Sequence, residues 1–196
     1  PSGTGKSTIN RRLVDELHDL EFSVSYTTRK KRAGESHGTH YWFIEKKEFE
    51  DLIAEDQMLE WAEVFGNYYG TSKKEIKRIT EDNKSALLEI DVQGWLSVKD
   101  KVDNLSSIFV LPPSIASLWK RLSERGTETN EVVLKRFKKA QIELTIGKDF
   151  ENFIINDDFE QTYQAIKHHM ISGKKLPMST QEGRDYCDRL LKEIET

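Results

Sequence analysis

The sequence predicts an α/β fold with a mostly parallel sheet, and three observations support that prediction. A glycine-rich stretch, PSGTGKST at residues 1–8, runs directly into apolar residues at helical spacing. Continuous apolar runs at residues 85–91 and 106–113 are typical of parallel strands that are buried on both faces. Helical patterns accompany these runs, and strands that alternate with helices favour a parallel sheet.

The remaining elements follow from periodicity and from turn-forming residues. A polar, basic loop is predicted at residues 27–39, and the aromatic residues 61–69 favour strand and turn. Residues 27–83 do not show the regular alternation of strands and helices, so we expect a separate lobe there. The further predicted strands span residues 22–26, 40–44 and 153–156. The predicted helices span residues 9–20, 49–53, 115–124, 133–144 and 159–170.

Composition limits the classes of function. The 196 residues suffice for one core, and no apolar run reaches the roughly 18 residues of a membrane span. A formal net charge of −4 argues against an electrostatic nucleic-acid binder, so neither a nucleic-acid nor a membrane partner is expected. The single cysteine, Cys187, can form no internal disulfide, and the sequence shows no signal peptide. These features predict a cytoplasmic protein.

The glycine-rich stretch matches the phosphate-binding pattern G-x-x-x-x-G-K-[ST] except for its first glycine. Backbone N–H groups around Gly3 and Gly5 would surround a phosphate, Lys6 would reach the β and γ phosphates of ATP, and the Ser7 hydroxyl would ligate Mg²⁺. A glycine-rich turn before a helix is the alternative. Because the motif normally follows a buried strand, we expect the native chain to begin before Pro1. The predicted cofactor-binding residues here are Ser2, Gly3, Thr4, Gly5, Lys6, Ser7 and Thr8.

A second set of residues suits a nucleoside monophosphate. The loop YTTRKKR, residues 26–32, concentrates four cations in an acidic protein, and Arg29 and Arg32 suit forked contacts with phosphate oxygens. A solvated basic loop explains the same residues equally well. Downstream, Tyr41 and Tyr69 can donate to a phosphate, and Glu60 can accept from a base.

Five segments in order, SVSYTTRKKRAGE, GTHYWFI, LEWAEVFGNYYGT, LLEIDVQG and RGTET, resemble the guanylate kinase family. The resemblance covers residues 1 to about 174 and implies a P-loop three-layer fold with an inserted GMP-binding lobe and a small helical lid. It also implies a Mg²⁺-dependent reaction in which ATP phosphorylates GMP, and dGMP as well, giving ADP and the nucleoside diphosphate. The implied division is a core (1–24, 84–117, 143–174), a lobe (25–83), a lid (118–142) and a tail (175–196) that can form a helix packed on the core or on a second subunit.

Roles for individual residues follow from the same resemblance. Arg125 and Arg136 would close over the transferring phosphoryl group, and Asn156 would lie near the adenine. Together with Lys6 and Arg29, these two arginines are the predicted catalytic residues. The residues implied to hold the GMP phosphate are Arg29, Arg32, Tyr41 and Tyr69. Those implied to recognise guanine are Ser25, Glu60 and Thr71, with Gly70 in the same run and Asp91 nearby.

The same resemblance leaves a rival function open. Guanylate-kinase-like domains also serve as non-catalytic peptide-binding modules, which typically have a degraded ATP loop and lack part of the arginine set. Here GTGKS, Arg29, Arg32, Arg125 and Arg136 are all present, which favours the enzyme. A P-loop GTPase would need an NKxD motif, and the sequence contains none.

Overall fold

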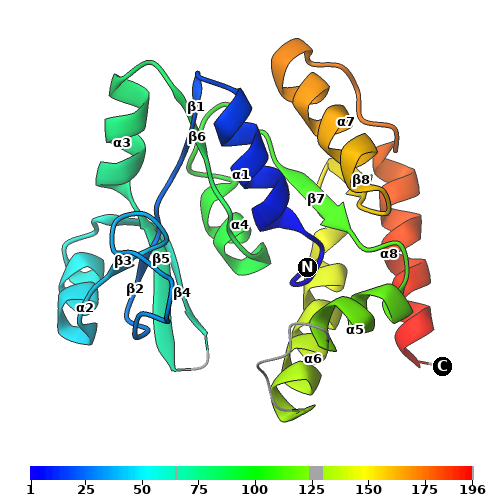
Figure 1. Cartoon of the computed structure of the whole chain (residues 1–196), viewed down its shortest axis with the longest axis horizontal. Coiled ribbons are helices and arrows are strands. Elements are labelled where there is room, and N and C mark those ends of the chain that lie inside the picture. Colours follow the sequence, from blue (N-terminus) through cyan, green and yellow to red (C-terminus); the bar gives the residue numbers. More distant parts are fainter. Residues whose placement is uncertain (65, 124–129, 196) are drawn as a thin grey trace. The chain divides into compact units, whose positions relative to one another are not determined.

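The computed structural model describes residues 1–64, 66–123 and 130–195, without the side chains of 130–133 and 136. The chain forms two compact units (Figure 1). Unit 1 combines Pro1–Ile9 with Ser106–Thr196, and unit 2 is Asn10–Leu105. The first helix, α1 (Lys6–Glu16), begins in unit 1 and continues into unit 2.

Unit 1 is built on one parallel strand pair covered by helices. The strands β7 (Ile108–Leu111) and β8 (Asn152–Ile155) pair with Phe109 opposite Phe153. Both are largely buried, as expected for continuous apolar runs. The helices of this unit are α5 (Ile115–Ser123), α6 (Asn130–Gly147), α7 (Phe159–Ser172) and α8 (Thr180–Glu195).

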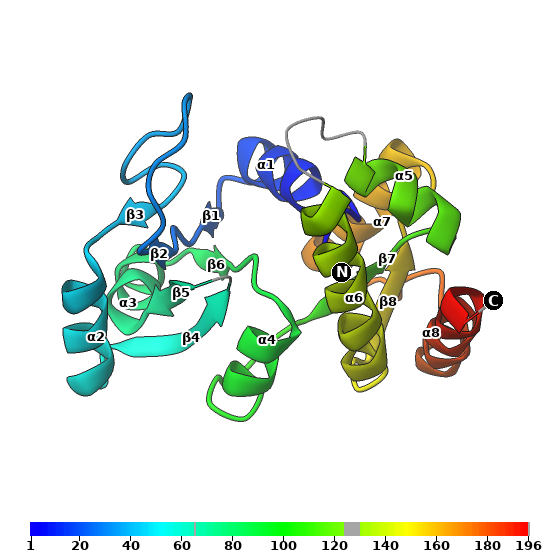
Figure 2. The same ribbon diagram turned by 90° about the horizontal axis from the view of Figure 1, so that it is seen from below.

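Two glycines let helices approach this strand pair closely. A Cβ atom added at Gly147 of α6 would overlap the ring of Phe109, and one added at Gly183 of α8 would overlap Phe153. Helix α8 lies within the predicted tail and packs on β8 and α6, as Figure 2 shows. The tail therefore forms a helix that contributes Cys187 and Leu190 to the core of unit 1.

Unit 2 contains a parallel pair and a mixed four-stranded sheet. The pair joins β1 (Leu20–Phe22) to β6 (Ser85–Leu87), and the four-stranded sheet has the order β3-β2-β5-β4. Within that sheet β2 and β3 are parallel and the other neighbours are antiparallel. The strands of this sheet are β2 (Tyr26–Thr27), β3 (Trp42–Phe43), β4 (Met58–Val64) and β5 (Asn67–Ser72). The helices of unit 2 beyond α1 are α2 (Lys46–Ala54), α3 (Lys73–Glu81) and α4 (Val92–Val98).

The structure confirms the α/β class through its parallel pairs β1–β6 and β7–β8. Several bounds differ from those that periodicity predicted. The strand predicted at 40–44 shortens to β3, and the one predicted at 85–91 ends at Leu87, with Asp91 at the cap position of α4. Helices α3 and α4 were not predicted from the sequence.

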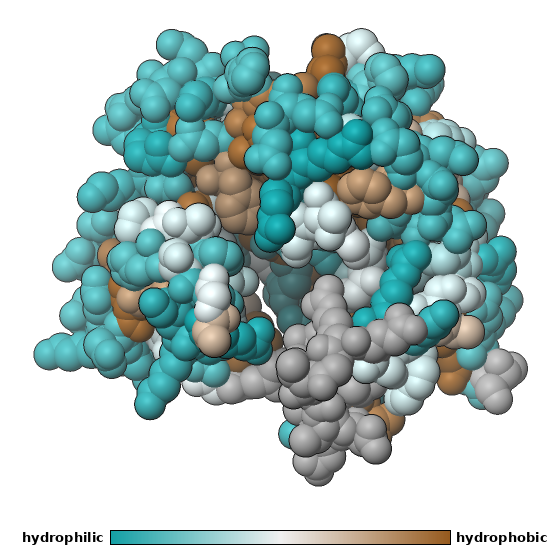
Figure 3. Space-filling model, in the orientation of Figure 1, coloured by the Kyte–Doolittle hydropathy of each residue, from teal (hydrophilic) through white to brown (hydrophobic). Residues whose placement is uncertain are grey.

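The surface of the described part is mostly polar. On the face shown in Figure 3, hydrophilic residues cover most of the surface. None of the helices that the structure describes has the length and apolar character needed to cross a membrane.

Candidate functional site

The glycine-rich stretch, residues 1–8, forms a tight loop at the start of α1, and we call it the phosphate loop. Gly3 and Gly5 have φ values of 84° and 85°, a left-handed conformation that favours glycine. The Thr4 hydroxyl and the Lys6 Nζ both donate to the carbonyl oxygen of Pro1, at 2.9 and 2.5 Å. Since α1 begins at Lys6, the loop's N–H groups lie at a helix N-terminus, where an anion is favoured.

Three neighbouring elements hold the phosphate loop in place. Beyond the end of β8, Asn156 Nδ2 donates to the carbonyl oxygen of Thr4 at 2.8 Å. From α6, Glu143 Oε2 accepts from the Ser2 N–H at 3.0 Å. From α5, Leu122 lies so close that a Cβ at Gly3 would be 3.0 Å from its Cδ2. Asn156, which the resemblance assigns to the adenine, thus supports the loop itself, while its contact with adenine stays a prediction.

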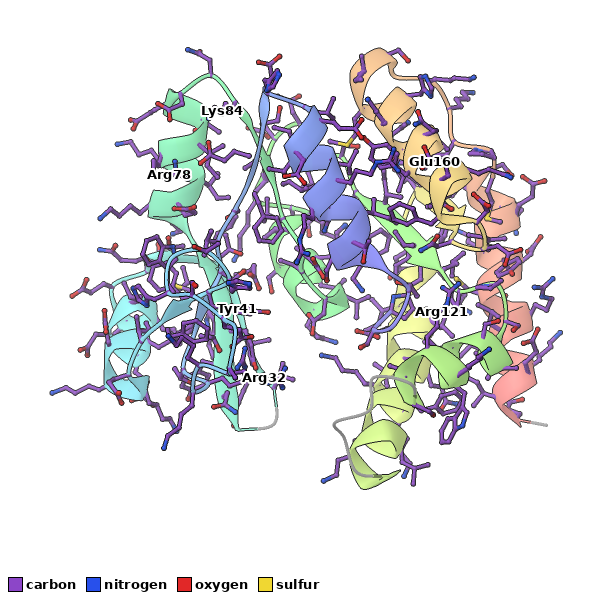
Figure 4. All side chains as sticks on the ribbon, viewed as in Figure 1. Arg32, Tyr41, Arg78, Lys84, Arg121 and Glu160 are labelled. Atoms are coloured by element: carbon purple, nitrogen blue, oxygen red, sulfur yellow. The ribbon has the colours of Figure 1, made fainter. Side chains whose placement is uncertain are left out.

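The phosphate-binding cluster predicted in unit 2 is centred on Arg29. Its Cζ lies 5.5 Å from the Tyr41 ring centroid, and the Tyr41 and Tyr69 rings meet edge to face at 5.9 Å. Burial raises the pKa of Tyr41, which keeps its hydroxyl protonated as a donor. Tyr41 and Arg32 are labelled in Figure 4, in the part of unit 2 formed by β2, β3 and their connecting loop. The structure therefore brings three of the four predicted phosphate ligands together.

Glu35 is the residue of this cluster that the sequence did not indicate. Its carboxylate accepts from Arg29 Nη2 and Nη1 at 2.8 and 3.0 Å, and from the Arg32 N–H at 2.7 Å. These donors lower the pKa of Glu35 to about 2. Glu35 thus presents two oxygens to Arg29 in the way a phosphate would. An acid three residues after Arg32 is the signal in the sequence, but the pairing depends on how the loop folds.

Two of the residues predicted to recognise guanine, Glu60 and Thr71, meet where β4 and β5 pair. Glu60 and Thr71 are register partners, and the Thr71 hydroxyl donates to Glu60 Oε1 at 2.8 Å. Glu60 is 7% exposed, and this burial raises its pKa, as does the nearby charge of Asp91. A Cβ at Gly94 would lie 2.8 Å from Glu60 Oε2, and one at Gly70 would lie 2.5 Å from the Glu60 carbonyl oxygen. Gly94 thus leaves room for the Glu60 carboxylate, and Gly70 lets β5 lie close to the backbone of β4.

The other predicted site residues have contacts or positions that do not by themselves indicate a ligand. Asp91 Oδ1 caps α4 by accepting from the N–H groups of Gln93 and Gly94. The Ser25 carbonyl oxygen accepts from the Trp42 N–H. Ser7 and Thr8 lie in the first turn of α1. Arg125 and the side chain of Arg136 fall outside the described residues, so their catalytic roles stay predictions.

Comparisons with known proteins agree with this arrangement. A family model described as guanylate kinase matches residues 1–172. The chain is 43% identical over 174 residues to a guanylate kinase of Caldanaerobacter subterraneus subsp. tengcongensis, which covers 89% of this chain and 84% of that protein. It is 41% identical over 186 residues to the guanylate kinase of Escherichia coli K12, covering 94% and 89%.

A solved structure extends the similarity to the backbone. The crystal structure of guanylate kinase from Anaplasma phagocytophilum has a TM-score of 0.70 and 31% identity, and covers 85% of this chain and 80% of that one. The sequence motifs, the shared fold and the family model over residues 1–172 agree with one another. The chain belongs to the guanylate kinase family.

Proposed function

We propose that this chain transfers the γ-phosphoryl group of ATP to GMP, giving ADP and GDP. Family membership makes it a kinase that acts on GMP. One observation carries the proposal for this particular chain: unit 2 holds both the buried Glu60–Thr71 pair and the Arg29–Tyr41–Tyr69 cluster. An acid for the base and a cation for the phosphate are what GMP requires.

The phosphate of GMP would bind at Arg29. Its guanidinium is already held in a fork by Glu35, and this hydrogen bonding raises the pKa of Arg29, so the residue stays cationic. A phosphate dianion carries more charge than the carboxylate and competes for the same donors. The hydroxyls of Tyr41 and Tyr69 supply further donors to the phosphate, and Arg32 supplies a second cation.

The guanine base would bind at Glu60. Guanine presents its N1–H and its 2-amino group as donors, to which a carboxylate offers acceptors. Adenine has an unprotonated N1 and no 2-amino group, so a buried carboxylate facing it would lose its partners at about 1–3 kcal/mol per missing bond. Thr71 already satisfies Glu60 Oε1 and orients the side chain. We place Ser25 and Asp91 beside this base site.

ATP would bind at the phosphate loop, with Lys6 on the β and γ phosphates. The attacking oxygen of GMP is already anionic, so no general base is needed. The obstacle is repulsion, since two like unit charges 4 Å apart repel by about 4 kcal/mol at an effective dielectric constant of 20. The cations assigned to the two nucleotides offset that repulsion, and we assign Arg125 and Arg136 to the junction between the two phosphates.

Mg²⁺ fits this site through the Ser7 hydroxyl in the first turn of α1. A single hydroxyl suits Mg²⁺, which takes most of its ligands from ATP phosphates and water in such sites. When bound it would neutralise phosphate charge. We also propose the division into core, GMP lobe and lid, use of dGMP, and a cytoplasmic location where these nucleotides are found.

A base-selectivity assay tests the proposal. ADP release is measured with ATP and Mg²⁺ against GMP, AMP, UMP and CMP in turn. We expect ADP release with GMP at least about thirtyfold faster than with AMP, from two lost hydrogen bonds, and faster than with UMP and CMP. No preference for GMP would overturn the assignment of Glu60. No ADP release with any acceptor would favour the non-catalytic peptide-binding module.

A further inference from the structure

Helix α6 places a buried acid against the phosphate loop. Glu143 is 4% exposed and is the one buried acid among the described side chains of unit 1. Its Oε2 accepts from the Ser2 N–H at 3.0 Å, across 141 residues of sequence. No part of the proposed phosphoryl transfer uses this residue, and the sequence motifs did not indicate it.

A buried carboxylate beside the phosphate loop is energetically unfavourable, so its presence calls for a physical explanation. Burying a charged group is unfavourable unless it is paired or hydrogen-bonded. A negative charge beside a loop that binds a triphosphate also opposes the ligand by Coulomb repulsion. A leucine of similar size would fill the same space without either cost. The feature that leucine cannot supply is an acceptor for the Ser2 N–H.

That acceptor fixes one end of the phosphate loop. Thr4 is held at its carbonyl oxygen by Asn156, and the Pro1 carbonyl oxygen collects the Thr4 hydroxyl and Lys6. Glu143 adds a contact at Ser2, ahead of the two left-handed glycines. These contacts restrain the Pro1–Ser2 peptide plane, through both its carbonyl oxygen and its N–H, and the Thr4–Gly5 plane, through its carbonyl oxygen. Restrained planes keep the following N–H groups aimed where a phosphate binds.

We propose that Glu143 is a positioning residue for ATP: its carboxylate fixes the Ser2 amide, and α6 thereby controls the geometry of the phosphate loop. The inference deepens the proposed function, because it concerns the ATP site of that reaction. Helix α6 also carries Arg136, which lies seven residues before Glu143, or about two helical turns. The helix that holds the loop through Glu143 thus continues, toward its N-terminus, into the segment assigned to the lid, residues 118–142.

The test compares two variants of Glu143 with a control on the same helix. Glu143→Gln keeps an acceptor oxygen for the Ser2 N–H, and Glu143→Leu removes it. Thr145→Ala is the control, since Thr145 is exposed on α6 and its hydroxyl contacts only the Gln141 carbonyl oxygen among described contacts. Binding of a non-hydrolysable ATP analogue and of GMP is measured by calorimetry, below the melting temperature of each variant.

We expect Glu143→Leu to raise the dissociation constant of the ATP analogue about tenfold or more, the cost of one unsatisfied buried donor. Glu143→Gln and Thr145→Ala stay within about threefold of the unmodified protein, because glutamine keeps an acceptor oxygen and Thr145 is exposed. GMP affinity changes less than about twofold in all three, because the residues assigned to GMP belong to unit 2. Loss of thermal stability in Glu143→Leu with unchanged ATP affinity would overturn the proposal, since that is the result of a packing role alone.

A second measurement serves if Glu143→Leu does not fold. The Ser2 amide proton is followed by NMR in the unmodified protein and in Glu143→Gln. We expect its resonance to move upfield in the variant, because a carboxylate is a stronger acceptor than an amide oxygen. An unchanged Ser2 resonance would contradict the proposal. Both readouts are independent of turnover, so loss of phosphoryl transfer in the unmodified protein would count against the proposed function and not against Glu143.

Discussion

Glu60 and Glu35 lie in the same unit, yet their surroundings move their pKa values in opposite directions. Burial raises the pKa of Glu60, and the nearby Asp91 charge adds to that effect. Hydrogen bonds from Arg29 lower the pKa of Glu35 to about 2. Glu60, which accepts from the Thr71 hydroxyl, would gain further donors from a bound base, whereas Glu35 is paired with Arg29. The two acids can therefore be distinguished by experiment, Glu60 by the pH dependence of GMP use and Glu35 by the pH dependence of stability.

Replacing Glu60 tests base recognition. We expect Glu60→Gln to lower kcat/KM for GMP by about ten- to hundredfold, because one acceptor facing guanine becomes a donor. KM for ATP changes little. The wild-type kcat/KM for GMP also falls on acidification, through a pKa above that of an ordinary glutamate, as Glu60 is protonated. Steady-state kinetics across pH measure both effects, and equal losses for GMP and ATP would rule out this role.

Replacing Glu35 tests its pairing with Arg29. A carboxyl group whose pKa is lower in the folded state stabilises the fold above its unfolded pKa, and that contribution is lost as pH falls toward 2. We expect Glu35→Gln to be less stable than the unmodified protein at neutral pH, with the difference shrinking below about pH 4.3, the unfolded value. Urea unfolding at several pH values measures it. A difference independent of pH would exclude the ion pair as the cause.

At the scale of elements, the close approach of α8 to β8 depends on one glycine. A side chain at Gly183 would overlap Phe153, which is fully buried in the core of unit 1. The helix also contributes Glu193, whose Oε2 accepts from the Ile115 N–H at the start of α5. Helix α8 thus connects the strand pair to the helix that packs on Gly3.

We expect Gly183→Ala to lower the free energy of unfolding by about 1–3 kcal/mol, the usual cost of overpacking a core. Thermal unfolding measures the change. Lys192→Ala, at an exposed position of the same helix, is the control and stays within about 0.5 kcal/mol. A Gly183→Ala protein as stable as the control would show that α8 does not pack closely on β8.

The elements that sequence predicted well are those with a strong apolar pattern. The predicted strand at 153–156 corresponds to β8, and the predicted helix at 115–124 corresponds to α5. Helix α3 was missed because KKEIKRITE offers two isoleucines among charges; its start is set by the Ser72 cap, and Arg78 ties it to Glu21 of β1. Arg78 and Lys84, both bound to Glu21, are labelled in Figure 4. Contacts of this kind depend on tertiary structure, which periodicity does not report.

At the scale of the whole molecule, the two nucleotides are assigned to residues of different units. The phosphate loop belongs to unit 1, while Arg29 and Glu60 belong to unit 2. The motif and the resemblance predicted both sets from the sequence, because glycines, arginines and tyrosines at these spacings are chemically distinctive. Glu35 and Glu143 were not found, since an isolated acid has no pattern and its partner, Arg29 or the Ser2 N–H, is set by the fold.

Replacing Lys6 tests whether phosphoryl transfer and GMP binding depend on different residues. We expect Lys6→Ala to lower kcat by about a hundredfold or more, because a cation that stabilises the transferring group is lost. GMP affinity stays within about twofold, since the residues assigned to GMP belong to unit 2. Single-turnover kinetics and calorimetry with GMP measure the two quantities. Turnover at the unmodified rate would remove the phosphate loop from the reaction.

Direct observation of the products by ³¹P NMR tests the central claim most simply. Purified protein is mixed with ATP, Mg²⁺ and GMP, and the phosphorus resonances are followed over time. If the cations assigned to the two nucleotides support phosphoryl transfer, the GMP and ATP signals fall together while GDP and ADP appear in equal amounts. If both nucleotides bind and yet no GDP forms, the phosphoryl-transfer account is contradicted.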